Sequence, residues 1–160
     1  MLGTQIALAS TRDERITWWF AKAFPLIEKY KYADVEIEFD AALATYDKDN
    51  KSDQGFMYWR TVSWLALVKT RLRQSRTSWA PLFEAVLSHQ ELLHGVDHDH
   101  VIDTKLFYSQ SLVGVRELEL GGTLLDECFE STQRLYGDNH HMSITMRVSK
   151  CTARMKITRA

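Results

Sequence analysis

The histidines are the side chains whose type and spacing best suit chemistry in this sequence. Four of them fall in two short segments: His98, His100, His140 and His141. Imidazole nitrogens bind Zn²⁺, usually as part of a tetrahedral set of four ligands. The two pairs lie in matching turns about one helix pair apart, which is too far for one ion, and no cysteine or carboxylate pattern accompanies them. We therefore predict no metal site and no cofactor, with a shared metal ion as the less favoured alternative.

The two histidine segments are copies of one motif. When Gly95 is placed on Gly137, His94–Asp103 (HGVDHDHVID) matches Tyr136–Thr145 (YGDNHHMSIT). This offset, the repeat period, is about 40 residues and is typical of a repeat protein. Each copy indicates a helix that ends at a left-handed glycine, a turn, and a second helix. We expect Asp97 and Asn139 to cap the second helices, with the histidines packed against the turns.

The composition limits the class of protein. The 160 residues include 20 basic and 21 acidic side chains, so no strong field favours nucleic acid or an anionic membrane. Seven glycines, two prolines and little apolar–polar alternation predict an all-α chain. Two cysteines predict reduced thiols and a cytoplasmic location. No leader peptide and no apolar run of about 18 residues is found, so we expect no membrane association.

About seven helices are expected in a single domain spanning residues 1–160. A short arm at 1–10 precedes three helix pairs, and a final unpaired helix suggests a fragment of a longer protein. The predicted pairs are 12–48, 56–94 and 98–136, and the last helix is 141–157.

Several local features refine these boundaries. Pro25 is expected to kink or end the first helix near Phe24. Ser78 is expected to cap the helix that carries Pro81 in its first turn. The pair Gly121–Gly122 is expected to form the reversal that leads into a helix over 124–136. The polar segment 47–55 is expected to be a surface loop.

This pattern resembles the tetratricopeptide repeat, in the 42-residue form of kinesin light chains and of many bacterial and fungal regulators. The segment KYADVEIEFDAALATY follows the family order of aromatic, small and Ala-Leu positions. The turns HGVDHDH and YGDNHH resemble the Leu-Gly, two residues, His-Pro turn, although Asp99 and His141 replace the proline. The resemblance implies a right-handed superhelix of antiparallel helical hairpins, with a concave groove that binds a peptide or partner domain.

The candidate groove residues are aromatic or basic. Two groups of side chains stand out. The basic side chains of the last helix recur at i, i+3 and i+7 on one face. More aromatic side chains than two helices normally need for a core are found in the cluster Trp18, Trp19, Phe20, Phe24, Tyr58, Trp59 and Trp64. The alternative for each is core packing, a solvated face or contact with a further helix. The candidates are Trp19, Trp59, Arg60, Trp64, Lys105, Tyr108, Arg147, Lys150 and Arg154.

The sequence contains no glycine-rich phosphate loop, nucleophile elbow or credible Cys–His pair, so we predict that the chain is not an enzyme. The favoured function is a non-catalytic interaction module that binds a peptide, a partner domain or another copy of the chain. The alternative is a regulatory or sensor region of a larger signalling protein or bacterial transcription activator, with a small molecule in the groove. No helix-turn-helix is visible, so direct contact with nucleic acid is not expected.

Overall fold

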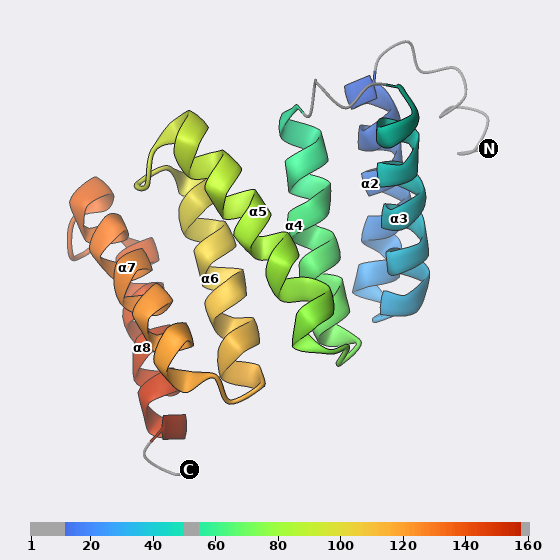
Figure 1. The fold of residues 1–160 in the computed structure, drawn as a ribbon. Helices are drawn as coiled ribbons and strands as arrows, with labels where there is room; N and C mark the ends of the chain where they lie inside the picture. The colour runs from blue at the N-terminus through green and yellow to red at the C-terminus, as the bar shows by residue number, and fades with distance from the viewer. Residues whose placement is uncertain (1–11, 50–54, 158–160) are drawn as a thin grey trace. The chain divides into compact units, whose positions relative to one another are not determined.

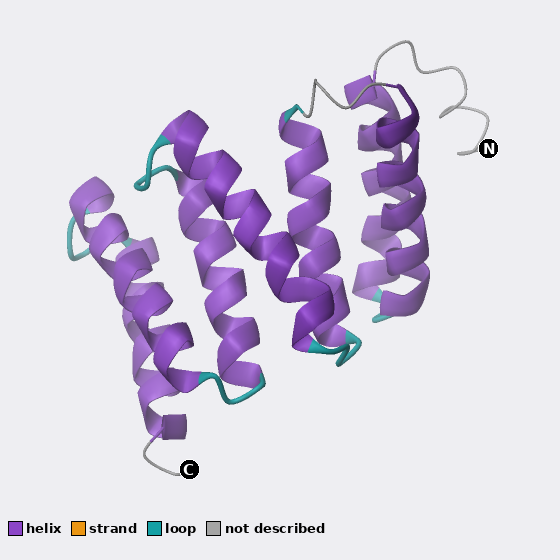
Figure 2. Cartoon of the chain, viewed as in Figure 1, coloured by secondary structure: helices purple, strands orange, loops and turns teal. Residues whose placement is uncertain are grey.

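The computed structural model describes residues 12–49 and 55–157, and all regular structure in these ranges is α-helical (Figures 1 and 2). The helices are α2 Arg12–Glu28, α3 Tyr32–Asp49, α4 Phe56–Arg71, α5 Arg76–His94, α6 Asp99–Gly114, α7 Leu118–Tyr136 and α8 His141–Ile157. The predicted all-α class with about seven helices is confirmed. The expected arm at 1–10 and most of the expected 47–55 loop lie outside the described residues.

The chain divides into two compact units, Met1–Leu82 and Phe83–Ala160. In the first unit, α2, α3 and α4 pack together. Helix α3 buries Val35, Phe39 and Ala42 completely, at the i, i+4, i+7 spacing of one helical face. In the second unit, α7 packs against both α6 and α8. No described helix combines the length and the apolar character that a membrane span requires.

The core of the second unit joins its three last helices. Ile102 of α6, Cys128 of α7 and Met146 of α8 form one buried cluster. Val113 and Leu125 form a second cluster between α6 and α7. Burying an aliphatic side chain contributes about 1.5–3 kcal/mol, so these clusters fix how α7 lies on α6 and α8.

The first helix does not stop at Pro25. It continues through Pro25 to Glu28, so of the two expected outcomes, a kink or an end near Phe24, the end is wrong. Pro25 lies close to the end of α2, where an interruption of the hydrogen-bond ladder affects few following residues.

Three helices end in the same turn, which the sequence analysis did not predict. Helices α2, α4 and α6 end in a Schellman motif at Tyr30, Arg73 and Arg116, with φ of 56°, 55° and 66°. In the last of them, the N–H of Glu117 donates to the carbonyl of Leu112 at 2.9 Å. Glycine usually occupies such a left-handed position. The helices α5 and α7 do end at glycines, Gly95 with φ of 82° and Gly137 with φ of 77°, as predicted.

The cap of α5 lies three residues earlier than predicted. The helix begins at Arg76, and the carbonyl of Ser75 accepts hydrogen bonds from the backbone N–H and the hydroxyl of Ser78, at 2.9 and 2.8 Å. Ser78 therefore lies inside the first turn, and Pro81 follows it in the second. The next residue after Ser78, Trp79, is fully buried and donates its indole N–H to the carbonyl of Gln74 at 3.2 Å.

Gly121 and Gly122 do not form the reversal. Both lie inside α7, which begins at Leu118, and the chain reverses at Arg116 instead. A Cβ on Gly121 would lie 2.9 Å from Cγ2 of Val113 and 3.1 Å from the carbonyl oxygen of Ser109. This glycine therefore allows α7 to pack closely against α6.

Candidate interaction surface

The two histidine turns adopt the same structure, with a histidine as the helix cap. His98 Nδ1 accepts a hydrogen bond from the backbone N–H of His100 at 3.3 Å, and His140 Nδ1 accepts one from Met142 at the same distance. His98 precedes α6 and His140 precedes α8. Each imidazole therefore satisfies one of the unpaired backbone donors at the start of a helix.

Each capping histidine also stacks on the last residue of the preceding helix. The ring of His98 lies on that of His94, and the ring of His140 lies on that of Tyr136, both with centroids 4.5 Å apart. The expected packing of the histidines against the turns is therefore seen. In the described part of the chain, no three His, Cys, Asp or Glu side chains are arranged to hold a metal ion.

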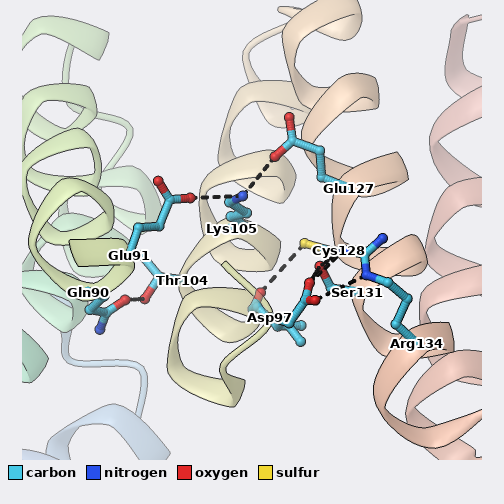
Figure 3. A network of polar contacts seen from close by, with 10 residues as sticks. Gln90, Glu91, Asp97, Thr104, Lys105, Glu127, Cys128, Ser131 and Arg134 are labelled. Carbon is cyan, nitrogen blue, oxygen red and sulfur yellow. Dashed lines mark hydrogen bonds and ion pairs between the residues drawn. The ribbon is translucent and has the colours of Figure 1, made fainter. Parts of the chain in front are cut away.

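Asp97 does not cap α6, because its carboxylate is held by α7. It accepts hydrogen bonds from Arg134 at 2.5 and 3.1 Å and from the hydroxyl of Ser131 at 2.7 Å (Figure 3). The hydrogen bonds of Arg134 and then Ser131 lower the pKa of Asp97 to about 2. The expected cap at Asp97 is wrong by one residue, and so is the cap at Asn139, since His140 takes that place.

The aromatic candidates of the first unit are half-buried. Trp64 packs on the core of α2, α3 and α4 and meets the edge of Phe24, with ring centroids 5.9 Å apart. Trp59 contacts Tyr58 at 5.2 Å, and Trp19 lies beneath the ammonium of Lys22 at 5.1 Å. All three tryptophans are half-buried, and Trp64 is the one of them that packs on this core cluster.

Arg60, the basic candidate of the first unit, is exposed, unlike the three tryptophans. Its guanidinium lies 6.0 Å from the ring of Phe56, near the beginning of α4. The indole N–H of Trp19 is buried and meets no hydrogen-bond acceptor among the described residues.

Lys105 and Tyr108 are buried and tie α6 to its neighbours. The ammonium of Lys105 lies 2.9 Å from Glu91 of α5 and 2.8 Å from Glu127 of α7 (Figure 3). The Tyr108 hydroxyl donates to Glu84 of α5 at 2.8 Å. Burial alone would lower the pKa of Lys105, but its hydrogen bonds to Glu127 and Glu91 outweigh that effect and raise it. Lys105 is therefore a charged link between three helices.

Arg147 and Lys150 of α8 both lie over the ring of Phe129. Their charged groups lie 5.7 and 5.3 Å from its centroid, within the range of a cation–π contact. Lys150 also lies 2.6 Å from Asp126 of α7, and Arg147 lies 3.9 Å from Asp138. The side chain of Arg154 is outside the described set.

These contacts repeat with the same period as the turns. Tyr108 and Lys150 occupy matching positions, and their acceptors Glu84 and Asp126 match as well. We call this set of contacting residues of the second unit the polar strip. It consists of Glu84, Glu91, Lys105, Tyr108, Asp126, Glu127, Phe129, Arg147 and Lys150.

The polar strip contains acidic residues as well as the basic candidates Lys105, Arg147 and Lys150. Acidic residues of α5 and α7 pair with its cations. Sequence reasoning missed these acids, and it missed Phe129 as well. The recurrence of an acid at Glu84 and Asp126, one period apart, was the signal that could have identified them. The strip is consequently close to neutral, because its three cations lie beside four carboxylates.

The comparisons with known proteins support the fold. No family model matches the sequence, and no curated protein matches it. Among solved structures, the chain is similar to the crystal structure of BtubC (BKLC) from P. vanneervenii, with a TM-score of 0.66 and 20% sequence identity. The match covers 91% of this chain and 62% of that one, so the chain spans less than two thirds of the length of BtubC. This similarity, together with the helical hairpins described above, shows a tetratricopeptide-like helical-repeat fold.

Proposed function

We propose that this chain is a non-catalytic protein-interaction module whose polar strip binds a peptide or a partner domain. The carrying observation is the ring of Phe129 in contact with the cations of Arg147 and Lys150, beside the partly exposed carboxylates of Asp126 and Glu127. A tetratricopeptide-like fold generally mediates contacts between proteins, which supports the same function. A cytoplasmic location belongs to this proposal.

The exposure of the charged groups suggests how a partner engages. The side chain of Arg147 is 53% exposed, whereas that of Lys105 is only 10% exposed. A partner carboxylate therefore reaches Arg147 and Lys150 first, while a basic partner group pairs with Asp126 or Glu127. Lys105 keeps the helices in place beneath them.

Selection from a library of displayed 12-residue peptides against the intact chain tests this function. We expect enriched peptides that carry acidic residues beside an aromatic or aliphatic one. Lys150→Glu should weaken their binding by about tenfold or more, because it places a third carboxylate beside Asp126 and Glu127 and removes a cation worth about 1.5–3 kcal/mol in a charged hydrogen bond.

Arg71→Glu is the matched control, since Arg71 is exposed on α4 outside the polar strip. It should leave peptide binding unchanged. The proposal fails if no peptide is enriched, or if the enriched peptides bind the Lys150→Glu and Arg71→Glu variants equally well.

A further inference from the structure

Helix α8 has a second apolar face that points away from its buried one. Its buried side is formed by Ser143 and Met146, both completely inaccessible to solvent. On the opposite side, Ile144 and Val148 are 49% and 61% exposed, and Cys151 is exposed as well. These three positions follow the i, i+4, i+7 spacing of a single stripe. Ile144 and Val148 are neighbours on one helical face, so they form a joint apolar patch, whereas single exposed apolar residues are common on protein surfaces.

The repeat itself shows what fits this stripe. Moved back by one repeat period, Ile144, Val148 and Cys151 become Ile102, Leu106 and Ser109 of α6. That stripe of α6 is covered by α7: Ile102 packs on Cys128, and Leu106 packs on both core clusters of the unit. Ile102 is 2% exposed and Ser109 is fully buried. The equivalent face of α8 therefore presents apolar residues at the positions where α6 is covered by one antiparallel helix.

The charge of α8 selects the kind of helix. Four basic residues and no acidic one lie between His141 and Ile157: Arg147, Lys150, Arg154 and Lys156. Two copies of α8 facing each other would bring like charges together, which is unfavourable. In the template pair, Lys105 of α6 bonds to Glu127 of α7 at 2.8 Å, and Arg147 is the residue that matches Lys105. A glutamate at the Glu127 position of an incoming helix would meet Arg147.

We infer that the stripe Ile144, Val148 and Cys151 is a docking site for an acidic amphipathic helix of a partner chain. The helix lies antiparallel to α8, as α7 lies on α6. It carries a small residue where Gly121 meets Ser109 and Val113, leucines three and four residues later, and a glutamate six residues later. This helix-docking face lies on a different side of α8 from Met146 and shares only Arg147 with the polar strip, so the Val148→Asp arm of its test does not depend on the proposed function.

The test uses a synthetic peptide with the sequence of α7, LELGGTLLDECFESTQRLY, labelled with a fluorophore and titrated with the full chain. We expect saturable binding that Val148→Asp weakens by about tenfold or more, since the variant loses the burial of a valine and buries a charge instead. Leu92→Asp is the matched control, because Leu92 is 85% exposed on α5 in the same unit. It should leave binding unchanged. Circular dichroism verifies that both variants keep their helical content.

Exchanging the charges of Arg147 and of the peptide's Glu127 tests the orientation of the bound helix. Arg147→Glu should weaken binding of the original peptide, and a peptide with Glu127→Lys should recover it. Two results overturn the inference. The first is peptide binding that Val148→Asp leaves intact, as would happen if the peptide replaced the resident α7. The second is a stable dimer of the chain alone that Val148→Asp abolishes, which would assign the face to a second copy.

Discussion

His98 and His140, one repeat period apart, cap their helices in the same way. Each accepts a hydrogen bond through Nδ1 from the backbone N–H two residues later, at 3.3 Å, and each ring stacks on the aromatic residue four positions earlier. The repeat is thus preserved at the level of single hydrogen bonds. Asparagine and aspartate, which are the usual capping residues, stand one position earlier and do not cap.

This arrangement predicts opposite results for two neighbouring residues. His140→Ala should lower the free energy of unfolding by about 1 kcal/mol, the typical value of a lost cap. Asn139→Ala should change it by less than about 0.5 kcal/mol, as for an ordinary surface substitution. Urea denaturation of the two variants and the parent chain measures both values. A larger loss for Asn139→Ala would restore the cap predicted from the sequence.

The sequence predicted the helices better than their contacts, for reasons that particular residues make clear. The stripe of Val35, Phe39 and Ala42 follows from helical periodicity, which is a local property. The choice between Asp97 and His98 as the cap depends on Arg134, a residue 37 positions away that draws the aspartate to α7. Local rules contain no information on such distant partners.

The candidate site follows the same division. Lys105 and Tyr108 were candidates from the sequence, but their carboxylate partners lie on α5 and α7, the helices before and after α6. The match of Glu84 with Asp126, one repeat period later, was present in the sequence. Only the structure shows that these two acids pair with Tyr108 and Lys150. The left-handed conformation of Tyr30, Arg73 and Arg116 could not be predicted from residue type, because none of them is glycine or asparagine.

Two adjacent glycines of α7 should respond oppositely to alanine. A Cβ at Gly121 would lie 2.9 Å from Val113 and 3.1 Å from the backbone oxygen of Ser109, so Gly121→Ala should destabilise the chain by about 1–3 kcal/mol. A Cβ at Gly122 meets no atom within 4 Å, and Gly122→Ala should stabilise by about 0.5–1 kcal/mol through helix propensity.

Thermal unfolding followed by circular dichroism compares the two glycine variants directly. Because both substitutions are chemically identical and one position apart, the difference isolates the contact between α6 and α7. Equal melting temperatures for the two variants would show that this close approach of the helices is absent.

The left-handed turn after α6 should be improved by glycine. Arg116 has φ of 66°, a conformation that costs an L-residue about 1–2 kcal/mol, whereas glycine adopts it freely but loses more chain entropy on folding. Arg116→Gly should therefore raise the free energy of unfolding by up to about 1 kcal/mol. Arg116→Ala, which removes the same charge and keeps the strained conformation, is the control and should give no gain in urea denaturation.

Asp97 should make the chain less stable in acid. The pKa of Asp97 in the folded chain is about 2, below its usual 3.8, because Arg134 and Ser131 hydrogen-bond to the carboxylate. A lowered pKa means that the unfolded chain binds the proton more readily, so the stabilisation is present above about pH 4 and is lost as the pH falls through about 2. Asp97→Asn should remove this part of the acid dependence and lower the melting temperature at pH 7.

Melting temperatures recorded between pH 2 and pH 7, in dilute solutions of the chain, measure the loss of stability that follows protonation of Asp97. Glu130→Gln, which removes an exposed carboxylate from α7, is the control and should leave the steep fall between pH 4 and pH 2 in place. Since Asp97 is the link between the turn after α5 and helix α7, the Asp97→Asn variant should also exchange its α6 amide protons faster at pH 7. If the parent chain and the Asp97→Asn variant lose stability in parallel over this range, Arg134 does not hold the Asp97 carboxylate in solution.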